Sequence, residues 1–131
     1  MEKDIIQNWF AEMVHSVVTR DLDAHMALVS KQVQVYGLPG RNPVDYRSWL
    51  QRRNNEFSKM RLRSLHYDGV RIKTIGLKRL AFSTKETMTA NDGSRVIINK
   101  DIMLQKEEDQ QWRVIEETIN DWHVIKPDNL S

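Results

Sequence analysis

The sequence predicts an α+β fold in which a curved antiparallel sheet wraps around three helices from the N-terminal half of the chain. Apolar residues in roughly the first sixty positions recur at helical spacing, whereas from residue 61 onward they alternate with the period of two that strands require. Long consecutive strands joined by short turns pair antiparallel. Their apolar face needs cover, and the amphipathic helices supply it.

Composition limits the classes of function. The chain has 131 residues, a usual size for a single domain, and its formal net charge of +2 is too small to argue for nucleic-acid binding. The absence of cysteine excludes disulfides, thiolate zinc sites and cysteine nucleophiles. No run approaches the ~20 apolar residues that cross a bilayer, and the N-terminus lacks a signal-peptide pattern, so we expect a cytoplasmic protein without a membrane partner.

The first two helices are predicted from apolar spacing and capping. The first has one continuous apolar face made of Ile5, Ile6, Trp9, Phe10, Met13, Val14, Val17 and Val18. Asp21 or Asp23 is suited to cap a second, shorter helix. Its apolar side consists of Leu22, Met26 and Val29, and His25 lies beside that side, where we expect it to be packed.

A short strand and a third helix follow. The strand is predicted over 33–37 and ends in a proline- and glycine-containing loop at 38–41. Asn42 before Pro43 predicts the helix start, with Asn42 as the cap and Asp45 completing a box-like pairing. The apolar stripe of this helix comprises Tyr46, Trp49, Leu50, Phe57 and Met60. Arg53 lies on the same stripe, where a further apolar residue is expected.

The C-terminal half predicts four long strands. The first spans 62–75 with a bend or bulge near Asp68-Gly69, and the last spans 112 to about 125. The residues Asn91-Asp92-Gly93 have the chemistry of a three-residue hairpin loop. If Ala90 pairs with Ser94, the register follows: Leu80 lies opposite Leu104, Phe82 opposite Ile102, and Glu86 opposite Ile98.

The order and spacing of several short motifs resemble the nuclear transport factor 2-like (NTF2-like) superfamily, and within it the small SnoaL-like domains. The motifs are Asp21-Leu22-Asp23-Ala24, Tyr36-Gly37 with Pro39-Gly40, and Trp112-Arg113-Val114-Ile115-Glu116-Glu117. The resemblance covers residues 4–126. It implies a cone-shaped, cystatin/NTF2-like sheet around a hydrophobic pocket. From its length and its C-terminal residues, the chain is expected to be a single domain over 1–131 in which 126–131 form a loose tail. The resemblance also implies that a homodimer through the outer face of the sheet is common.

The last strand also indicates a partner for the sheet. Trp112, Val114 and Trp122 alternate onto one face, while Ile115, Ile119 and Ile125 alternate onto the other. A strand that is apolar on both faces needs a second subunit or a further helical layer. We expect the homodimer, because two-fold homodimers are the commonest oligomers.

Three charged residues are predicted on the apolar face of the sheet and are the catalytic candidates. In the register above, Glu86 lies diagonal to Lys100, and Glu116 joins them if even-numbered residues of the last two strands share a face. In a desolvated site these groups would shift one another's pKa values, as general acid-base catalysis requires. The alternative is a structural cross-strand ladder of ion pairs, solvated or within a dimer interface.

The ligand-binding candidates are Tyr36, Tyr46, Trp49, Arg53 and Asp121. The arginine and the aromatic residues could line the pocket and hold a carboxylate or carbonyl of a small hydrophobic ligand, although such an arginine can also lie at a core edge with its stem buried. Asp121 and His123 share a face near the end of the last strand. Two ligands do not make a metal site, so no metal is predicted.

Known mechanisms of the superfamily match the sequence poorly. The ketosteroid isomerase-like members use an aspartate at the end of the first strand, where this chain has Gly37 or Leu38, and an oxyanion-hole tyrosine that corresponds to about Met13. The paired histidines of scytalone dehydratase-like members are not clearly present. A relation to SnoaL-like polyketide cyclases is neither selected nor excluded.

Two functions therefore stay open. The chain is expected to be a small-molecule-binding protein, either a cofactor-independent isomerase, cyclase or dehydratase, or a non-catalytic ligand-binding or dimerisation module. The sequence does not decide whether the chain is an enzyme. Binding of single-stranded nucleic acid would use the basic residues Arg52, Arg53, Lys59, Arg61 and Arg63, and the low net charge argues against it.

Overall fold

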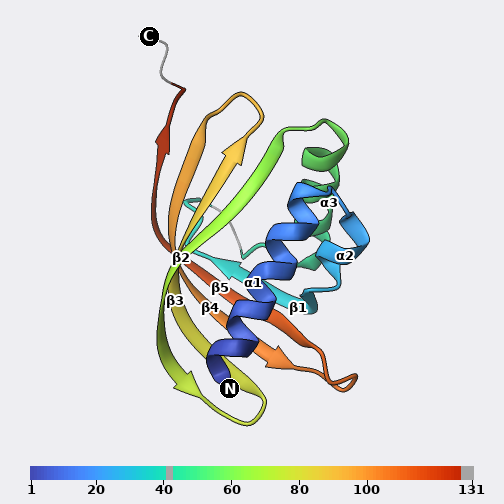
Figure 1. Ribbon diagram of the computed structural model, residues 1–131, viewed down its shortest axis with the longest axis vertical. Helices are drawn as coiled ribbons and strands as arrows, with labels where there is room; N and C mark the ends of the chain where they lie inside the picture. The colour runs from blue at the N-terminus through green and yellow to red at the C-terminus, as the bar shows by residue number, and fades with distance from the viewer. Residues whose placement is uncertain (41–42, 128–131) are drawn as a thin grey trace.

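The computed structural model describes residues 1–40 and 43–127. The helices are α1 (Glu2–Val18), α2 (Leu22–Met26) and α3 (Tyr46–Ser58). The strands are β1 (Val29–Tyr36), β2 (Leu62–Ile75), β3 (Arg79–Ala90), β4 (Arg95–Lys106) and β5 (Trp112–Ile125). They form one five-stranded sheet in the order β1-β5-β4-β3-β2 (Figure 1).

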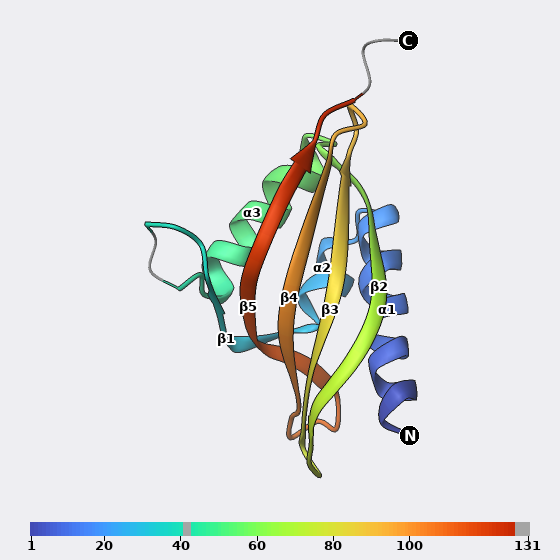
Figure 2. The same ribbon diagram turned by 90° about the vertical axis from the view of Figure 1, so that its left-hand side faces the viewer.

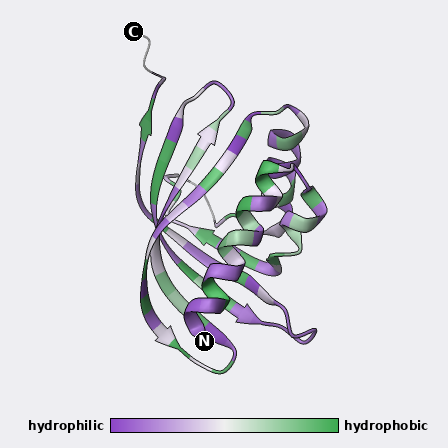
Figure 3. Cartoon of the chain, in the orientation of Figure 1, coloured by the Kyte–Doolittle hydropathy of each residue, from purple (hydrophilic) through white to green (hydrophobic). Residues whose placement is uncertain are grey.

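The molecule has two layers, a curved sheet and a layer of helices on its inner face. After a 90° turn that brings the sheet to the front, the outer face of β2 to β5 carries no helix (Figure 2). The residues of α1 and α3 alternate between hydrophobic and hydrophilic, as cover for a sheet requires (Figure 3). The predicted α+β architecture is confirmed. Within the described residues, no helix is long and apolar enough to cross a membrane.

The core lies between α1 and the lower half of the sheet as drawn in Figure 1. Phe82 of β3 is fully buried and meets Phe10 of α1 edge to face, and Phe10 stacks on Tyr67 of β2 at a ring distance of 4.2 Å. The apolar face predicted for α1 is buried at Ile6, Trp9, Phe10, Met13 and Val17. Because α1 fills this half, the other half of the sheet is left to α3.

The β3–β4 hairpin has the predicted register. Leu80 pairs with Leu104, Phe82 with Ile102, and Glu86 with Ile98. In the loop Gly93 has a φ of 90°, which favours glycine, and the backbone N–H of Ala90 donates to the Ser94 carbonyl at 2.8 Å. Local loop chemistry therefore sets the pairing of these two strands.

The β2 strand has the predicted bounds, and its pairing with β3 shifts between Asp68 and Arg71, as expected from Asp68-Gly69. β1 differs from the prediction in two respects. It begins at Val29 rather than Val33, which removes Val29 from the second helix, and it pairs parallel with β5. The order of helices and strands along the chain does not by itself predict that β1 pairs parallel with β5 at the edge of the sheet.

The predicted start of the third helix is wrong. Asn42 lies outside the described residues, but Val44 pairs its backbone with Val35 in both directions, so the chain is still extended there. The helix begins at Tyr46, and Asp45 is its cap, because Asp45 Oδ1 accepts a hydrogen bond from the Ser48 N–H at 2.9 Å. At α2 the cap is Asp21, one of the two predicted.

Two bulges in β5 change which of its side chains face inward. Val114 lies opposite Leu104, but Glu116 lies opposite Met103, so Ile115 is an extra residue. A second shift leaves out Asn120. Each bulge reverses the alternation of inward and outward side chains. Between the bulges it is the odd-numbered residues of β5 that face the helices.

Candidate functional site

A cavity of about 490 Å³ lies between α3 and the inner face of β3, β4 and β5. Most of its lining is apolar, and its charged residues are Arg52, Arg53, Glu56, Arg61, Lys100 and Glu117. Exposure distinguishes its two ends. Lys100 and Glu117 are buried at the floor, whereas Trp122 and Val124 are 44% and 50% exposed at the mouth. The size and apolar lining are those of a small-molecule site.

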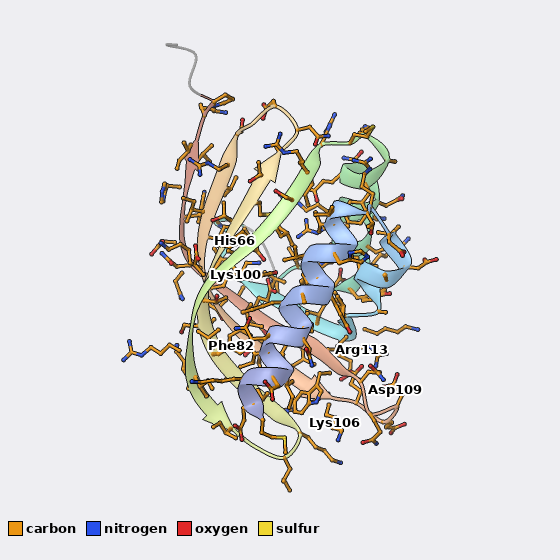
Figure 4. All side chains as sticks on the ribbon, viewed as in Figure 1. His66, Phe82, Lys100, Lys106, Asp109 and Arg113 are labelled. Atoms are coloured by element: carbon orange, nitrogen blue, oxygen red, sulfur yellow. The ribbon has the colours of Figure 1, made fainter. Side chains whose placement is uncertain are left out.

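A buried cluster of Glu86, Lys100 and Glu117, here called the floor cluster, lies at the inner end of the cavity. The exposed fractions of these residues are 2%, 6% and 2%. Lys100 Nζ lies 2.9 Å from one carboxylate oxygen of each glutamate, and it donates a well-aligned hydrogen bond to Glu117 Oε1. Lys100 belongs to the middle of β4 and lies at the centre of the sheet (Figure 4). Only Lys100 and Glu117 of this cluster line the cavity.

The two carboxyl groups of the floor cluster have pKa values shifted in opposite directions. Burial acts to raise the pKa of Glu86, but the charge of Lys100 and the Tyr67 side chain, which lies opposite Glu86 across β2 and β3, outweigh it and lower that pKa. Burial raises the pKa of Glu117, and the neighbouring Glu86 charge adds to that rise against the attraction of Lys100. Glu86 is therefore the lasting anion, and Glu117 is the group placed to take up and release a proton.

Lys100 remains the cation of this group. Burial acts to lower its pKa, but the charges of Glu117 and Glu86 outweigh burial and raise it. With two carboxylates on one ammonium, Lys100 keeps a partner even when Glu117 is protonated. Glu86 is thus a partner for Lys100 in either protonation state of Glu117.

A second polar cluster, here called the helix cluster, comprises Ser16, His25, Trp49 and Arg53. His25 Nε2 accepts hydrogen bonds from Trp49 Nε1 at 3.0 Å and from Arg53 Nε at 3.3 Å. Its Nδ1 lies 3.0 Å from Ser16 Oγ, which itself donates to the Met13 carbonyl. Because Nε2 accepts and the Ser16 proton is used elsewhere, the proton of the neutral ring lies on Nδ1 and is donated to Ser16.

The imidazole of His25 is held neutral. Burial, followed by the positive charges of Arg53 and Lys100, lowers its pKa to about 3. The ring therefore does not transfer protons near neutral pH. Its role is to fix Trp49 and Arg53, the two residues of the helix cluster that line the cavity.

Arg53 contributes a buried guanidinium to the cavity wall. It is 8% exposed and packs over the Trp49 ring, 5.8 Å from the ring centroid. Its Nη1 donates to Glu56 Oε1 at 2.7 Å, one helical turn further along α3. Hydrogen bonds to His25 and to Glu56 thus fix the guanidinium group of Arg53. A fixed, planar guanidinium suits recognition of a carboxylate or a carbonyl.

The structure brings together some of the predicted catalytic residues and corrects one. Glu86 and Lys100 lie together as the β3–β4 register predicts. Glu116 is not in the cluster. The bulge at Ile115 turns Glu116 to the outer face opposite Met103, and Glu117 takes the inward position. A catalytic role for these residues stays a prediction.

Two of the five predicted ligand-binding residues line the cavity, and three lie elsewhere. Trp49 and Arg53 line the cavity. Tyr36 is 40% exposed and does not line it, and Tyr46 borders a separate depression beside β1. Asp121 lies on the outer face, where its carboxylate accepts a hydrogen bond from Asn99 at 2.6 Å. These last three residues therefore lie outside the cavity, and a ligand-binding role for them stays a prediction. In the described ranges, no group of three or more His, Asp or Glu side chains could hold a metal ion.

Gly37 is one of the two positions that match the aspartate of the ketosteroid isomerase-like members, and its packing excludes a side chain there. Its φ is 95°, and a Cβ atom at this position would collide with the backbone carbonyl oxygen of Ile119 in β5. The close approach of the two backbones excludes a side chain. A general base at residue 37 is thus incompatible with this packing.

Comparison with solved structures identifies the fold. An NTF2-like protein from Cytophaga hutchinsonii superposes with a TM-score of 0.74 at 13% identity, over 91% of this chain and 97% of that one. A protein with a cystatin-like fold from Nostoc punctiforme superposes with a TM-score of 0.68 at 14% identity, over 89% and 88% of the two chains. This chain has the NTF2-like fold. No protein-family model and no curated protein matches its sequence.

The NTF2-like fold is shared with proteins of different kinds. A hexachlorocyclohexane dehydrochlorinase (LinA, type 2) superposes with a TM-score of 0.69 at 10% identity, over 99% of this chain and 93% of that one. Identities this low establish the fold alone, because one fold carries many functions. The function has to be argued from the cavity itself.

Proposed function

We propose that the chain is a cofactor-independent enzyme that transfers a proton next to a carbonyl group of a small hydrophobic molecule, as an isomerase, cyclase or dehydratase does. The observation that supports this most is the opposite shift of two carboxyl pKa values around one lysine, with only the raised one, Glu117, lining the cavity. A structural ion-pair ladder does not require one of its acids to line an apolar cavity.

In the proposed reaction Glu117 is the general base. Its carboxylate removes a proton from the carbon beside the carbonyl, and the electrons of that C–H bond pass to the carbonyl oxygen to form an enolate. Lys100, which is within hydrogen-bond distance of Glu117, stabilises the oxyanion. The enolate electrons then re-form the carbonyl. In an isomerisation Glu117 returns the proton to the γ-carbon of a conjugated enolate, and in a dehydration it gives the proton to a β-hydroxyl group, whose C–O bond breaks to release water as a C=C bond forms.

The apolar lining supports the same reaction. Burial of Glu117 raises its pKa and so makes it a stronger base than an ordinary carboxylate. Arg53, fixed by His25 and Glu56, is a second group that can orient the carbonyl. The proposal needs no cofactor, because every step moves only a proton and an electron pair.

Glu116 provides a matched control for the test. The probe reaction is exchange of the α-protons of 2-tetralone for deuterium in D₂O, followed by proton NMR. Because Glu117→Gln removes the base without changing side-chain size, we expect exchange to fall by about 100-fold or more. Glu116→Gln, with the same chemical change on the outer face, is expected to keep the parent rate.

A non-catalytic binding module would give a different result. It would bind 2-tetralone without accelerating exchange, and neither variant would change the rate. Equal rates for the parent protein, Glu117→Gln and buffer would overturn the proposal. The homodimer through the outer face stays a separate proposal. The bulges place Ile119 inside the cavity rather than on the outer face, so the two-faced apolar pattern no longer supports it.

A further inference from the structure

Charge is distributed unevenly along the cavity. The floor carries the carboxylates of the floor cluster, whereas the α3 side and the mouth carry Arg52, Arg53 and Arg61. Among the described lining residues of that side, Glu56 is the one carboxylate. A ligand in the cavity therefore meets a positive field at one end and a proton acceptor at the other.

Of these arginines, Arg52 and Arg61 have guanidinium groups that can bind a ligand. Glu56 is held mainly by Arg53 at 2.7 Å, and the Arg52 Nε lies 4.0 Å from the other Glu56 oxygen. The Arg52 side chain is 61% exposed. Arg61 follows α3 directly after Met60, whose φ of 55° turns the chain at the helix end, and it too lies at the mouth. Both side chains can therefore rotate toward an anion at the entrance.

The mouth also exposes apolar surface that a ligand would cover. Trp122 and Val124 are half exposed on the β5 side of the entrance, opposite the arginines. Hydrophobic contact on one side and cations on the other suit the junction between an apolar body and an anionic head group.

We infer that the ligand is a hydrophobic carboxylic acid, bound with its carboxylate between Arg52 and Arg61 at the mouth and its apolar body directed toward Lys100 and Glu117. This names the substrate class for the proposed function and rests on the same cavity. The carboxylate sets the orientation, and the carbonyl at the other end of the molecule meets the floor cluster.

The test compares a carboxylate with an uncharged molecule of the same shape. Isothermal titration calorimetry at pH 7 and low salt measures binding of 4-phenylbutyrate and of its primary amide to the full chain. We expect the acid to bind about tenfold more tightly, because an ionised partner strengthens hydrogen bonds from arginine. Added salt should reduce that preference, since the arginines at the mouth are reached by solvent.

Two double variants locate the effect. Arg52→Gln/Arg61→Gln should abolish the preference for the acid while binding the amide as before. Arg71→Gln/Lys85→Gln removes the same charge from exposed positions on the outer face of β2 and β3 and should keep the preference. Thermal unfolding of both variants confirms that each is folded.

Several outcomes would overturn the inference. These are equal affinity for acid and amide, no binding of either compound, or a preference that survives in Arg52→Gln/Arg61→Gln. The result is separable from the proposed catalysis, because Glu117→Gln should keep the preference for the acid. Acid binding without deuterium exchange would leave a carboxylate-binding site with no proton transfer, whereas exchange without acid preference would reject only the ligand class.

Discussion

The floor cluster and the helix cluster solve the same physical problem in opposite ways. Each buries ionisable side chains beside an apolar cavity, where a lone charge costs several kcal/mol. The floor cluster keeps its charges and pairs them, with Lys100 at 2.9 Å from both Glu86 and Glu117. The helix cluster removes the charge from its central residue, since the pKa of His25 is lowered to about 3.

This difference separates chemistry from positioning. The neutral imidazole of His25 has both ring nitrogens in hydrogen bonds, and it therefore holds the side chains of Trp49 and Arg53 in one orientation. A lysine shared by two carboxylates is a site where one proton can be gained or lost while a charged pair persists. Proton transfer is therefore expected at the floor, and ligand orientation at the α3 side.

The largest expected effect comes from breaking the floor cluster. Lys100→Met leaves two buried carboxylates without their cation and should lower the free energy of unfolding at pH 7 by about 3–5 kcal/mol. The deficit should shrink as the pH falls, because protonation neutralises the carboxylates. Urea denaturation at pH 7 and pH 5 measures both effects.

An exposed ion pair provides the control for Lys100→Met. Lys73 Nζ lies 2.9 Å from Asp101, with half of its side chain exposed. Lys73→Met should cost less than about 1 kcal/mol, because surface pairs contribute little. Similar losses for the two variants at pH 7 would show that the floor cluster is solvated rather than buried.

A smaller effect is expected from protonation at the helix cluster. Because the pKa of His25 is about 3 in the folded chain and 6.5 ordinarily, the unfolded chain binds its proton first as the pH falls. The stability from this group is complete above pH 6.5 and is lost as the pH falls toward 3, at up to about 1.4 kcal/mol per pH unit.

His25→Gln should flatten that dependence, because the amide oxygen still accepts from Trp49 and Arg53 but takes up no proton. Urea denaturation at pH 7, 6 and 5 gives the slope. His15→Gln, at an exposed position of α1, should keep the slope of the parent protein. A parent-like slope in His25→Gln would mean that the imidazole is charged in the folded chain.

The sequence predicted the parts of the fold that local chemistry determines. The loop Asn91-Asp92-Gly93 fixed the β3–β4 register, and that register placed Glu86 beside Lys100. The parallel edge between β1 and β5 had no local signal, because it depends on a pairing between distant segments. The helix cluster was missed for the same reason, since its residues come from α1, α2 and α3.

The inward position predicted for Glu116 is wrong, and the sequence contains the reason. Val114 and Ile119 are five positions apart, an odd separation that puts them on opposite faces of a regular strand. Without a bulge, this separation predicts a strand that is apolar on both faces. The alternative is a bulge between two inward residues, which is what β5 contains. A reversal of apolar alternation along one strand is thus a signal for a bulge as well as for a second interface.

The central claim is that Glu117 is a buried, proton-exchanging acid whose pKa lies above that of Glu86. The most direct measurement is a pH titration of the ¹³C side-chain carboxyl resonances, with Glu86→Gln and Glu117→Gln to assign them. The account predicts that Glu117 titrates above the ordinary glutamate value of 4.5 and Glu86 below it. Titration of Glu117 at or below 4.5, or of Glu86 above Glu117, would contradict it.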